Sequence, residues 1–99
     1  MEWQTSISNI ANGKELIRGY DLRELIQRSD FVSTIFLVLK GDLPNPHERR
    51  MLDALFTAAI DHGIGVSSAM TARTIASTGN SMHTALAGGI LSMGTLHGS

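Results

Sequence analysis

Four histidines are the residues of this 99-residue chain best suited to chemistry at neutral pH: His47, His62, His83 and His97. An imidazole can exchange a proton near pH 7, donate a hydrogen bond or bind a metal ion. Successive histidines are 15, 21 and 14 residues apart, so none of them form the closely spaced pairs of a helical metal site. The sequence also lacks cysteine, which excludes thiolate catalysis. It therefore predicts no metal site.

His62 stands in the run Asp61-His62-Gly63, where an apolar helical pattern ends. A carboxylate near an imidazole can set its tautomer and charge, which is an arrangement used in catalytic and binding sites. The competing interpretation is a histidine at a helix C-terminus that is stabilised by the helix dipole. Spacing alone favours this second interpretation.

His97 is flanked by glycines in the run Gly94-Thr95-Leu96-His97-Gly98. Glycines allow the backbone to approach a substrate closely, and an imidazole there can act as a general acid or base. The alternative is an ordinary loop histidine. His47 and His83 lie early in expected helices and are interpreted as surface residues.

Composition excludes several classes of function. The formal net charge is −1, so nothing steers the chain toward nucleic acid or an anionic membrane. The longest apolar run, residues 31–39, is too short to span a bilayer, and we expect a cytoplasmic protein. Ser67-Ser68 has no nucleophile-elbow motif, and Gly88-Gly89 lacks the lysine of a phosphate-binding loop.

The elements that must position the histidines are mostly helical. Alternation through Trp3, Thr5 and Ile7, a turn at Asn12-Gly13 and a return at Leu16-Ile17 predict a short hairpin. Residues 31–40 form a helix or a buried strand, and the caps at both ends favour the helix. The predicted helix starts are Asp21, Asp30, Asn45-Pro46, Ser67 or Ser68, and Ser81.

Short motifs along the chain resemble those of the citrate synthase family in order and spacing. They are residues 18–21 (RGYD), 41–44 (GDLP), 61–62 (DH), 72–79 (ARTIASTG) and 94–98 (GTLHG). Residues 61–67 (DHGIGVS) look like the pattern of the citryl-CoA lyase branch, including the lyase module of ATP-citrate lyase. The chain departs from the family at Ser99, where a second glycine is usual.

The resemblance implies a mainly α fold, with citrate synthase-like large-domain helices and a short N-terminal β-hairpin. Residues 1–99 would form a single partial domain, the N-terminal part of a large domain. It also implies an enzyme of the tricarboxylic acid cycle type, acting on the C–C bond between acetyl-CoA and oxaloacetate. His97 would stabilise the thioester enolate, and His62 would bind the oxaloacetate moiety. Coenzyme A would enter only as part of the substrate, with no other cofactor.

The expected partners are a second copy of the chain, with a dimer as the basic unit, and oxaloacetate or citrate with an acyl-CoA in the complete enzyme. The resemblance places the catalytic carboxylate and the small domain beyond His97, so we expect the chain alone to be inactive. One alternative is a non-catalytic helical dimerisation fragment, which the Ala/Gly face of Ala85, Ala87, Gly88 and Gly89 would suit. A helical binding module with a coincidental likeness is disfavoured by the order of the motifs.

Overall fold

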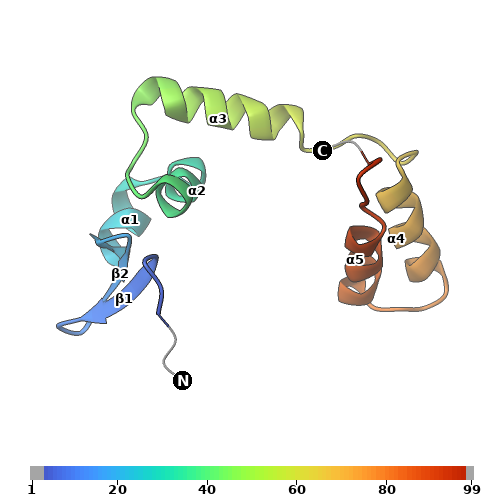
Figure 1. Ribbon diagram of the computed structural model, residues 1–99, viewed down its shortest axis with the longest axis horizontal. Helices are drawn as coiled ribbons and strands as arrows, with labels where there is room; N and C mark the ends of the chain where they lie inside the picture. Colours follow the sequence, from blue (N-terminus) through green and yellow to red (C-terminus); the bar gives the residue numbers. More distant parts are fainter. Residues whose placement is uncertain (1–3, 98–99) are drawn as a thin grey trace. The chain divides into compact units, whose positions relative to one another are not determined.

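The computed structural model describes residues 4–97, a range that contains three strands and five helices (Figure 1). The strands are β1 (Ser8–Ala11), β2 (Lys14–Ile17) and β3 (Tyr20–Asp21). The helices are α1 (Leu22–Arg28), α2 (Phe31–Lys40), α3 (Pro46–Ala58), α4 (Ser67–Ser77) and α5 (Met82–Leu91). Contacts divide the chain into two compact units, one up to Ala58 and one from Ala59 onward. The expected mainly α fold with an N-terminal hairpin is confirmed.

The hairpin turn lies where the sequence predicts it, but the first strand begins later. Asn12 and Gly13 both have positive φ values, 54° and 73°, as a tight two-residue hairpin turn requires. The turn pairs Ala11 with Lys14, so β1 covers residues 8–11 rather than the stretch through Thr5 and Ile7. Trp3 lies outside the described residues. The two-residue strand β3, which the sequence did not predict, extends the antiparallel sheet in the order β1-β2-β3.

Side-chain caps determine where α1 and α2 begin. The Asp21 carboxylate accepts a hydrogen bond from the Arg23 amide at 3.0 Å. Asp30 accepts one from the Ser33 amide at 2.8 Å, and α2 ends at Gly41 with a φ of 88°. These caps resolve the ambiguity of residues 31–40 in favour of a helix. Leu37 of α2 is fully buried and lies in the core of the N-terminal unit.

The start of α3 is a reciprocal capping box. The Asn45 side chain accepts from the Glu48 amide at 2.8 Å, and the Glu48 carboxylate accepts from the Asn45 amide at 3.0 Å. Pro46 occupies the first helical position, where its missing amide hydrogen costs no hydrogen bond. The predicted start of this helix is therefore confirmed.

The motifs RGYD and GDLP hold the N-terminal unit together. The Arg18 guanidinium donates through Nε and Nη2 to the Val38 carbonyl, at 3.1 and 2.9 Å, and so satisfies one of the last carbonyls of α2. Tyr20 Oη donates to the Asp42 carboxylate at 2.9 Å, and this bond with the Asp42 charge raises the pKa of Tyr20. Much of the sequence resemblance thus rests on residues with a structural role.

The C-terminal unit is a helical hairpin of α4 and α5. The chain reverses after α4 at Gly79, whose φ is 90°. Helix α4 begins at Ser67, one of its two predicted starts, and Val66 occupies its N-cap position. Ser81 is the N-cap of α5, as predicted. Ala85 and Gly89 are buried on one face of α5, four residues apart. Small residues at this spacing let the two helix backbones approach each other.

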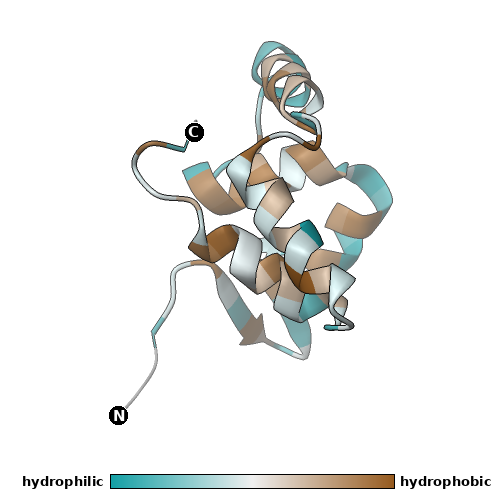
Figure 2. Cartoon of the chain, turned by 90° about the vertical axis from the view of Figure 1, so that its right-hand side faces the viewer, coloured by the Kyte–Doolittle hydropathy of each residue, from teal (hydrophilic) through white to brown (hydrophobic). Residues whose placement is uncertain are grey.

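Many apolar side chains remain exposed in the structure. Figure 2 shows hydrophobic positions recurring along the helices, and none of the side chains of α3 is buried. On α5, Leu91 is 86% exposed, and Met82, Leu86 and Ile90 are also exposed. Within residues 4–97 no helix is long and apolar enough to cross a membrane.

Candidate functional site

His62 and His97 line the same pocket in the C-terminal unit. The pocket has a volume of about 630 Å³ and opens to solvent. Its walls come from the loop before α4, the first turn of α4 and the segment after α5. The lining includes Asp61, His62, Val66, Ser68, Leu96 and His97. The fold therefore brings together the two histidines to which the resemblance gives roles, although 35 residues separate them in the sequence.

A hydrogen bond to Ser68 orients His97. The Nε2 atom of His97 lies 3.0 Å from Ser68 Oγ, and both residues are partly buried. The His97 amide also donates to the Gly94 carbonyl at 3.0 Å, which closes a turn after α5. If Ser68 donates its hydroxyl proton, a neutral His97 carries its own proton on Nδ1. The contact orients the ring, and with the serine as donor it favours that tautomer.

The loop around His62 is held by the neighbouring carboxylate. Asp61 Oδ1 accepts a hydrogen bond from the Gly63 amide at 2.9 Å, and Gly63 has a φ of 82°. Helix α3 ends at Ala58, so His62 lies four residues beyond the helix, in an exposed loop. The interpretation of His62 as a helix C-terminal histidine is therefore wrong. Asp61 supports this loop by accepting the hydrogen bond from the Gly63 backbone amide.

The other two histidines lie outside this pocket. His47 is exposed in the first turn of α3, and His83 is exposed beside Ser81 Oγ at the start of α5. Across residues 4–97 no group of three or more histidine, aspartate or glutamate side chains is placed to hold a metal ion.

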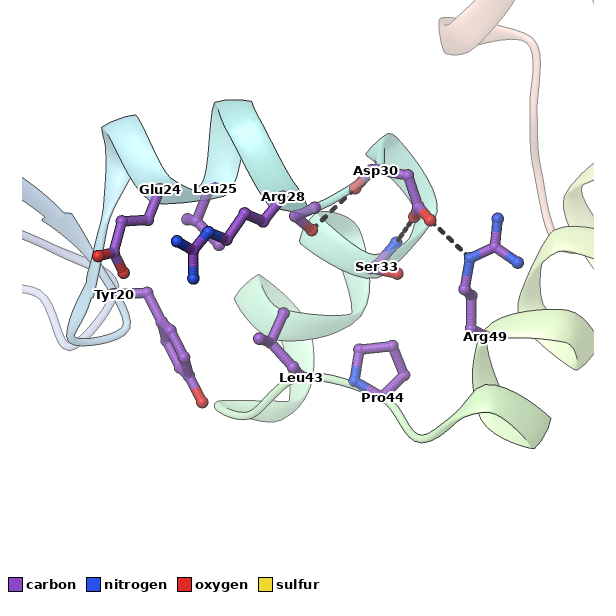
Figure 3. Close-up of a pocket in the computed structure, with 10 residues that line it drawn as sticks. Tyr20, Glu24, Leu25, Arg28, Asp30, Ser33, Leu43, Pro44 and Arg49 are labelled. Atoms are coloured by element: carbon purple, nitrogen blue, oxygen red, sulfur yellow. Dashed lines mark hydrogen bonds and ion pairs between the residues drawn. The ribbon is translucent and has the colours of Figure 1, made fainter.

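A second pocket, of about 370 Å³, lies in the N-terminal unit between α1, α2 and the start of α3 (Figure 3). Figure 3 shows Asp30 between Ser33 and Arg49, where it links the start of α2 to α3. The Ser33 amide and the Arg49 guanidinium hold the pKa of Asp30 at about 2. The Asp30 carboxylate therefore links α2 to α3.

Ser68 is a functional candidate that the sequence did not reveal. The sequence indicates Ser68 only as a possible helix start, and it has no nucleophile-elbow motif. Its contact with His97 joins residues 29 positions apart, and no local pattern reports such a pairing. The serine of the DHGIGVS pattern is its neighbour Ser67, so the motif pointed to the correct turn of α4 but not to the correct side chain.

Comparisons with known proteins agree with the geometry. Residues 44–99 match the family model described as the C-terminal domain of citrate synthase. Curated citrate synthase homologues from Mycobacterium tuberculosis and Mycobacterium bovis are 36% identical over 77 residues, which is 77% of this chain. The chain spans only about one fifth of their length, 20%.

Solved structures show the same fold. Citryl-CoA lyase from Hydrogenobacter thermophilus is 43% identical to this chain with a TM-score of 0.88, and the match covers 97% of this chain and 38% of that one. ATP citrate lyase from Methanothrix soehngenii, solved with citrate and coenzyme A, has a TM-score of 0.89 at 21% identity. That match covers 99% of this chain and 16% of the lyase, and it shows a shared fold.

Proposed function

This chain belongs to the citrate synthase family, and we propose that it is the part of a citryl-CoA lyase or citrate synthase-type enzyme that carries His62 and His97. The observation that carries the proposal is the single pocket lined by both histidines, in which Ser68 orients His97. The identity of 43% to a citryl-CoA lyase favours the lyase type.

The proposed chemistry needs a hydrogen-bond donor at a developing enolate. When citryl-CoA is cleaved, a base takes the proton of the citryl hydroxyl group and the C–C bond breaks. The bonding electron pair passes to the acetyl thioester, which becomes an enolate, and oxaloacetate leaves. Protonation of the enolate carbon completes acetyl-CoA. We assign His97 as the donor to the enolate oxygen, because a preorganised donor in a partly buried position stabilises that charge.

His62 is assigned to the oxaloacetate or citrate portion of the substrate. It is exposed on the wall of the pocket, on a loop held by Asp61, so its ring can reach a carboxylate or carbonyl group. Coenzyme A takes part only as the thioester of the substrate in this proposal, and no other cofactor is required.

We also propose that the chain alone is inactive and that its two units belong to one partial domain. Among the described residues that line the pocket, Asp61 is the one carboxylate, and its Oδ1 is held by the Gly63 amide. The chain also matches only 38% of the lyase structure. We therefore expect further polypeptide to supply the catalytic carboxylate.

A second candidate is a non-catalytic helical dimerisation fragment. The exposed apolar residues of α5 favour it, since a helix that is apolar on several faces is ordinarily covered by protein. We propose a dimer as the basic unit in either case. The two candidates differ in whether the histidine pocket is used.

A chimeric enzyme distinguishes the two candidate functions. This chain replaces the matched segment of the Hydrogenobacter thermophilus lyase, and the chimera is assayed with citryl-CoA. We expect activity, with His97→Ala lowering kcat about 100- to 1,000-fold and His62→Ala raising KM. His47→Ala, outside the pocket, is the matched control and should change neither. An active chimera that is indifferent to His97→Ala would refute the proposed role.

A further inference from the structure

Helix α5 meets the backbone of α4 at Gly89. A Cβ atom added to Gly89 would lie 3.0 Å from the Ser68 carbonyl oxygen and 3.3 Å from the Ala72 Cβ atom. Both distances are tighter than ordinary van der Waals contact, and the nearer neighbour is backbone. Because a helix backbone cannot rotate away as a side chain can, a larger residue at 89 must shift the first turn of α4 relative to α5 by a few tenths of an ångström.

The displaced residue is the one that orients His97. Ser68 contributes its carbonyl to the contact with Gly89 and its hydroxyl to the 3.0 Å contact with His97 Nε2. Gly89 also contacts the segment that leads to His97. The Gly89 carbonyl accepts a hydrogen bond from Ser92 Oγ at 2.7 Å, and Ser92 lies just before the loop that carries His97. Gly89 therefore lies between the two segments whose spacing sets the Ser68–His97 hydrogen bond.

We infer that Gly89 is a positioning residue for His97: its lack of a side chain sets the distance of Ser68 from the imidazole and so determines the orientation and tautomer of the ring. The inference rests on the proposed function only in one respect, which is that the proposed function gives His97 a catalytic task. A shift of a few tenths of an ångström at Ser68 lengthens or bends the hydrogen bond. Catalytic groups must be held to within about 0.5 Å of their working geometry, so such a shift uses up much of that tolerance.

Gly88 provides a matched control on the same helix. A Cβ atom there would overlap Ile75 Cδ1, which is the far end of a flexible side chain and can change rotamer. Both glycines lie inside α5, so alanine raises helix propensity by the same amount in the two variants. The variants differ in whether the new methyl group meets a movable side chain or the backbone of Ser68.

The test measures the ¹⁵N chemical shifts of the His97 ring in the full chain. Gly89→Ala should change the ratio of the Nδ1–H to the Nε2–H tautomer by about threefold or more. A change of this size is what a partial loss of one hydrogen bond would cause. Gly88→Ala should leave the ratio as in the parent chain. In a Ser68→Ala background, Gly89→Ala should have no further effect on the ring, because the hydroxyl through which it acts is gone.

Several outcomes would overturn the inference. These are an unchanged His97 ring in folded Gly89→Ala, an equal change in Gly88→Ala, or an undiminished effect in the Ser68→Ala background. If circular dichroism shows that Gly89→Ala is unfolded, the same measurement is made on Gly89→Ala/Ala72→Gly, which removes one of the two close contacts. Loss of fold there as well would contradict the local displacement that we infer. Because these readouts need no substrate, an inactive lyase graft would refute the proposed function and leave this inference standing.

Discussion

At the scale of single residues, the hydrogen bond between Ser68 and His97 distinguishes a positioned imidazole from an ordinary loop histidine. A ring that is held at Nε2 and carries its proton on Nδ1 is a donor of fixed direction. Among the described residues no side chain anchors the His62 ring in this way, and its loop is held through the Asp61–Gly63 turn. His97 is therefore suited to donating a hydrogen bond at a defined point, and His62 is suited to contacting a more variable group.

Ser68→Ala tests this difference directly. Loss of the hydroxyl should shift neutral His97 toward the Nε2–H tautomer by about threefold to tenfold, as expected for one hydrogen bond. Ser67→Ala is the control, because it removes a hydroxyl from the adjacent position in the same pocket lining. Ring ¹⁵N shifts report both variants. Equal changes in the two variants would mean that Ser68 does not orient the ring.

Asp30 predicts a pH dependence of stability in the N-terminal unit. Its carboxylate is held by the Ser33 amide and by Arg49, with a pKa of about 2 against an ordinary value of 3.8. A group whose pKa is lowered on folding stabilises the fold above pH 4, and this contribution disappears as the pH falls through 2. The effect should be modest, because Asp30 and Arg49 are each about half exposed and solvent screens their attraction.

Asp30→Asn isolates the charge, since the amide oxygen can still cap α2. We expect a lower Tm than the parent chain at pH 6 and a much smaller difference at pH 2, where the Asp30 carboxyl of the parent is about half protonated. Thermal unfolding followed by circular dichroism at both pH values measures this. A difference as large at pH 2 as at pH 6 would assign the effect to helix capping and not to the charge.

At the scale of elements, helix starts were predictable because they depend on neighbouring residues. Asp30, Gly41 and the Asn45-Pro46 pair lie within a few positions of the backbone groups that they satisfy, and all act as predicted. The first strand was misplaced because both of its faces are largely exposed, so apolar alternation carries no information about its register. The turn at Asn12-Gly13 sets that register instead.

The capping box of α3 should contribute measurably to helix stability. Asn45→Ala removes one of the two reciprocal hydrogen bonds and should cost about 1 kcal/mol. Urea unfolding, together with amide hydrogen exchange in the first turn of α3, gives the magnitude and the location. Gln27→Ala, an exposed substitution on α1, is the control and should change stability little. Unchanged exchange at Glu48 after Asn45→Ala would show that the box is not formed.

At the scale of the whole molecule, the exposed apolar surface agrees with the small share of charged residues, which is 17%. Helix α5 alone presents four large exposed apolar side chains, which suits a surface covered by a partner. The dimer and the cytoplasmic location stay predictions from the sequence. What no sequence pattern could supply was the joining of residues 62, 68 and 97 in one pocket, because that depends on the α4–α5 hairpin.

Leu91→Asp tests whether α5 is the self-association surface. Leu91 is 86% exposed, and a charge buried at an interface between two copies would carry a large desolvation cost. We expect the parent chain to be a dimer by light scattering and Leu91→Asp to be a monomer. Ile26→Asp changes an exposed residue of α1 and should leave the dimer intact. Dissociation by both variants alike would place the interface elsewhere or point to general unfolding.

His62 and His97 line one pocket, and we propose that this pocket accepts the carboxylates of citrate or oxaloacetate. The most direct measurement is a titration of the full chain with citrate, followed through the ring signals of all four histidines. We expect the ring signals of His62 and His97 to shift together and saturate with one Kd, whereas those of His47 and His83 stay unchanged. Equal shifts of all four rings, or none at His62 and His97, would contradict it.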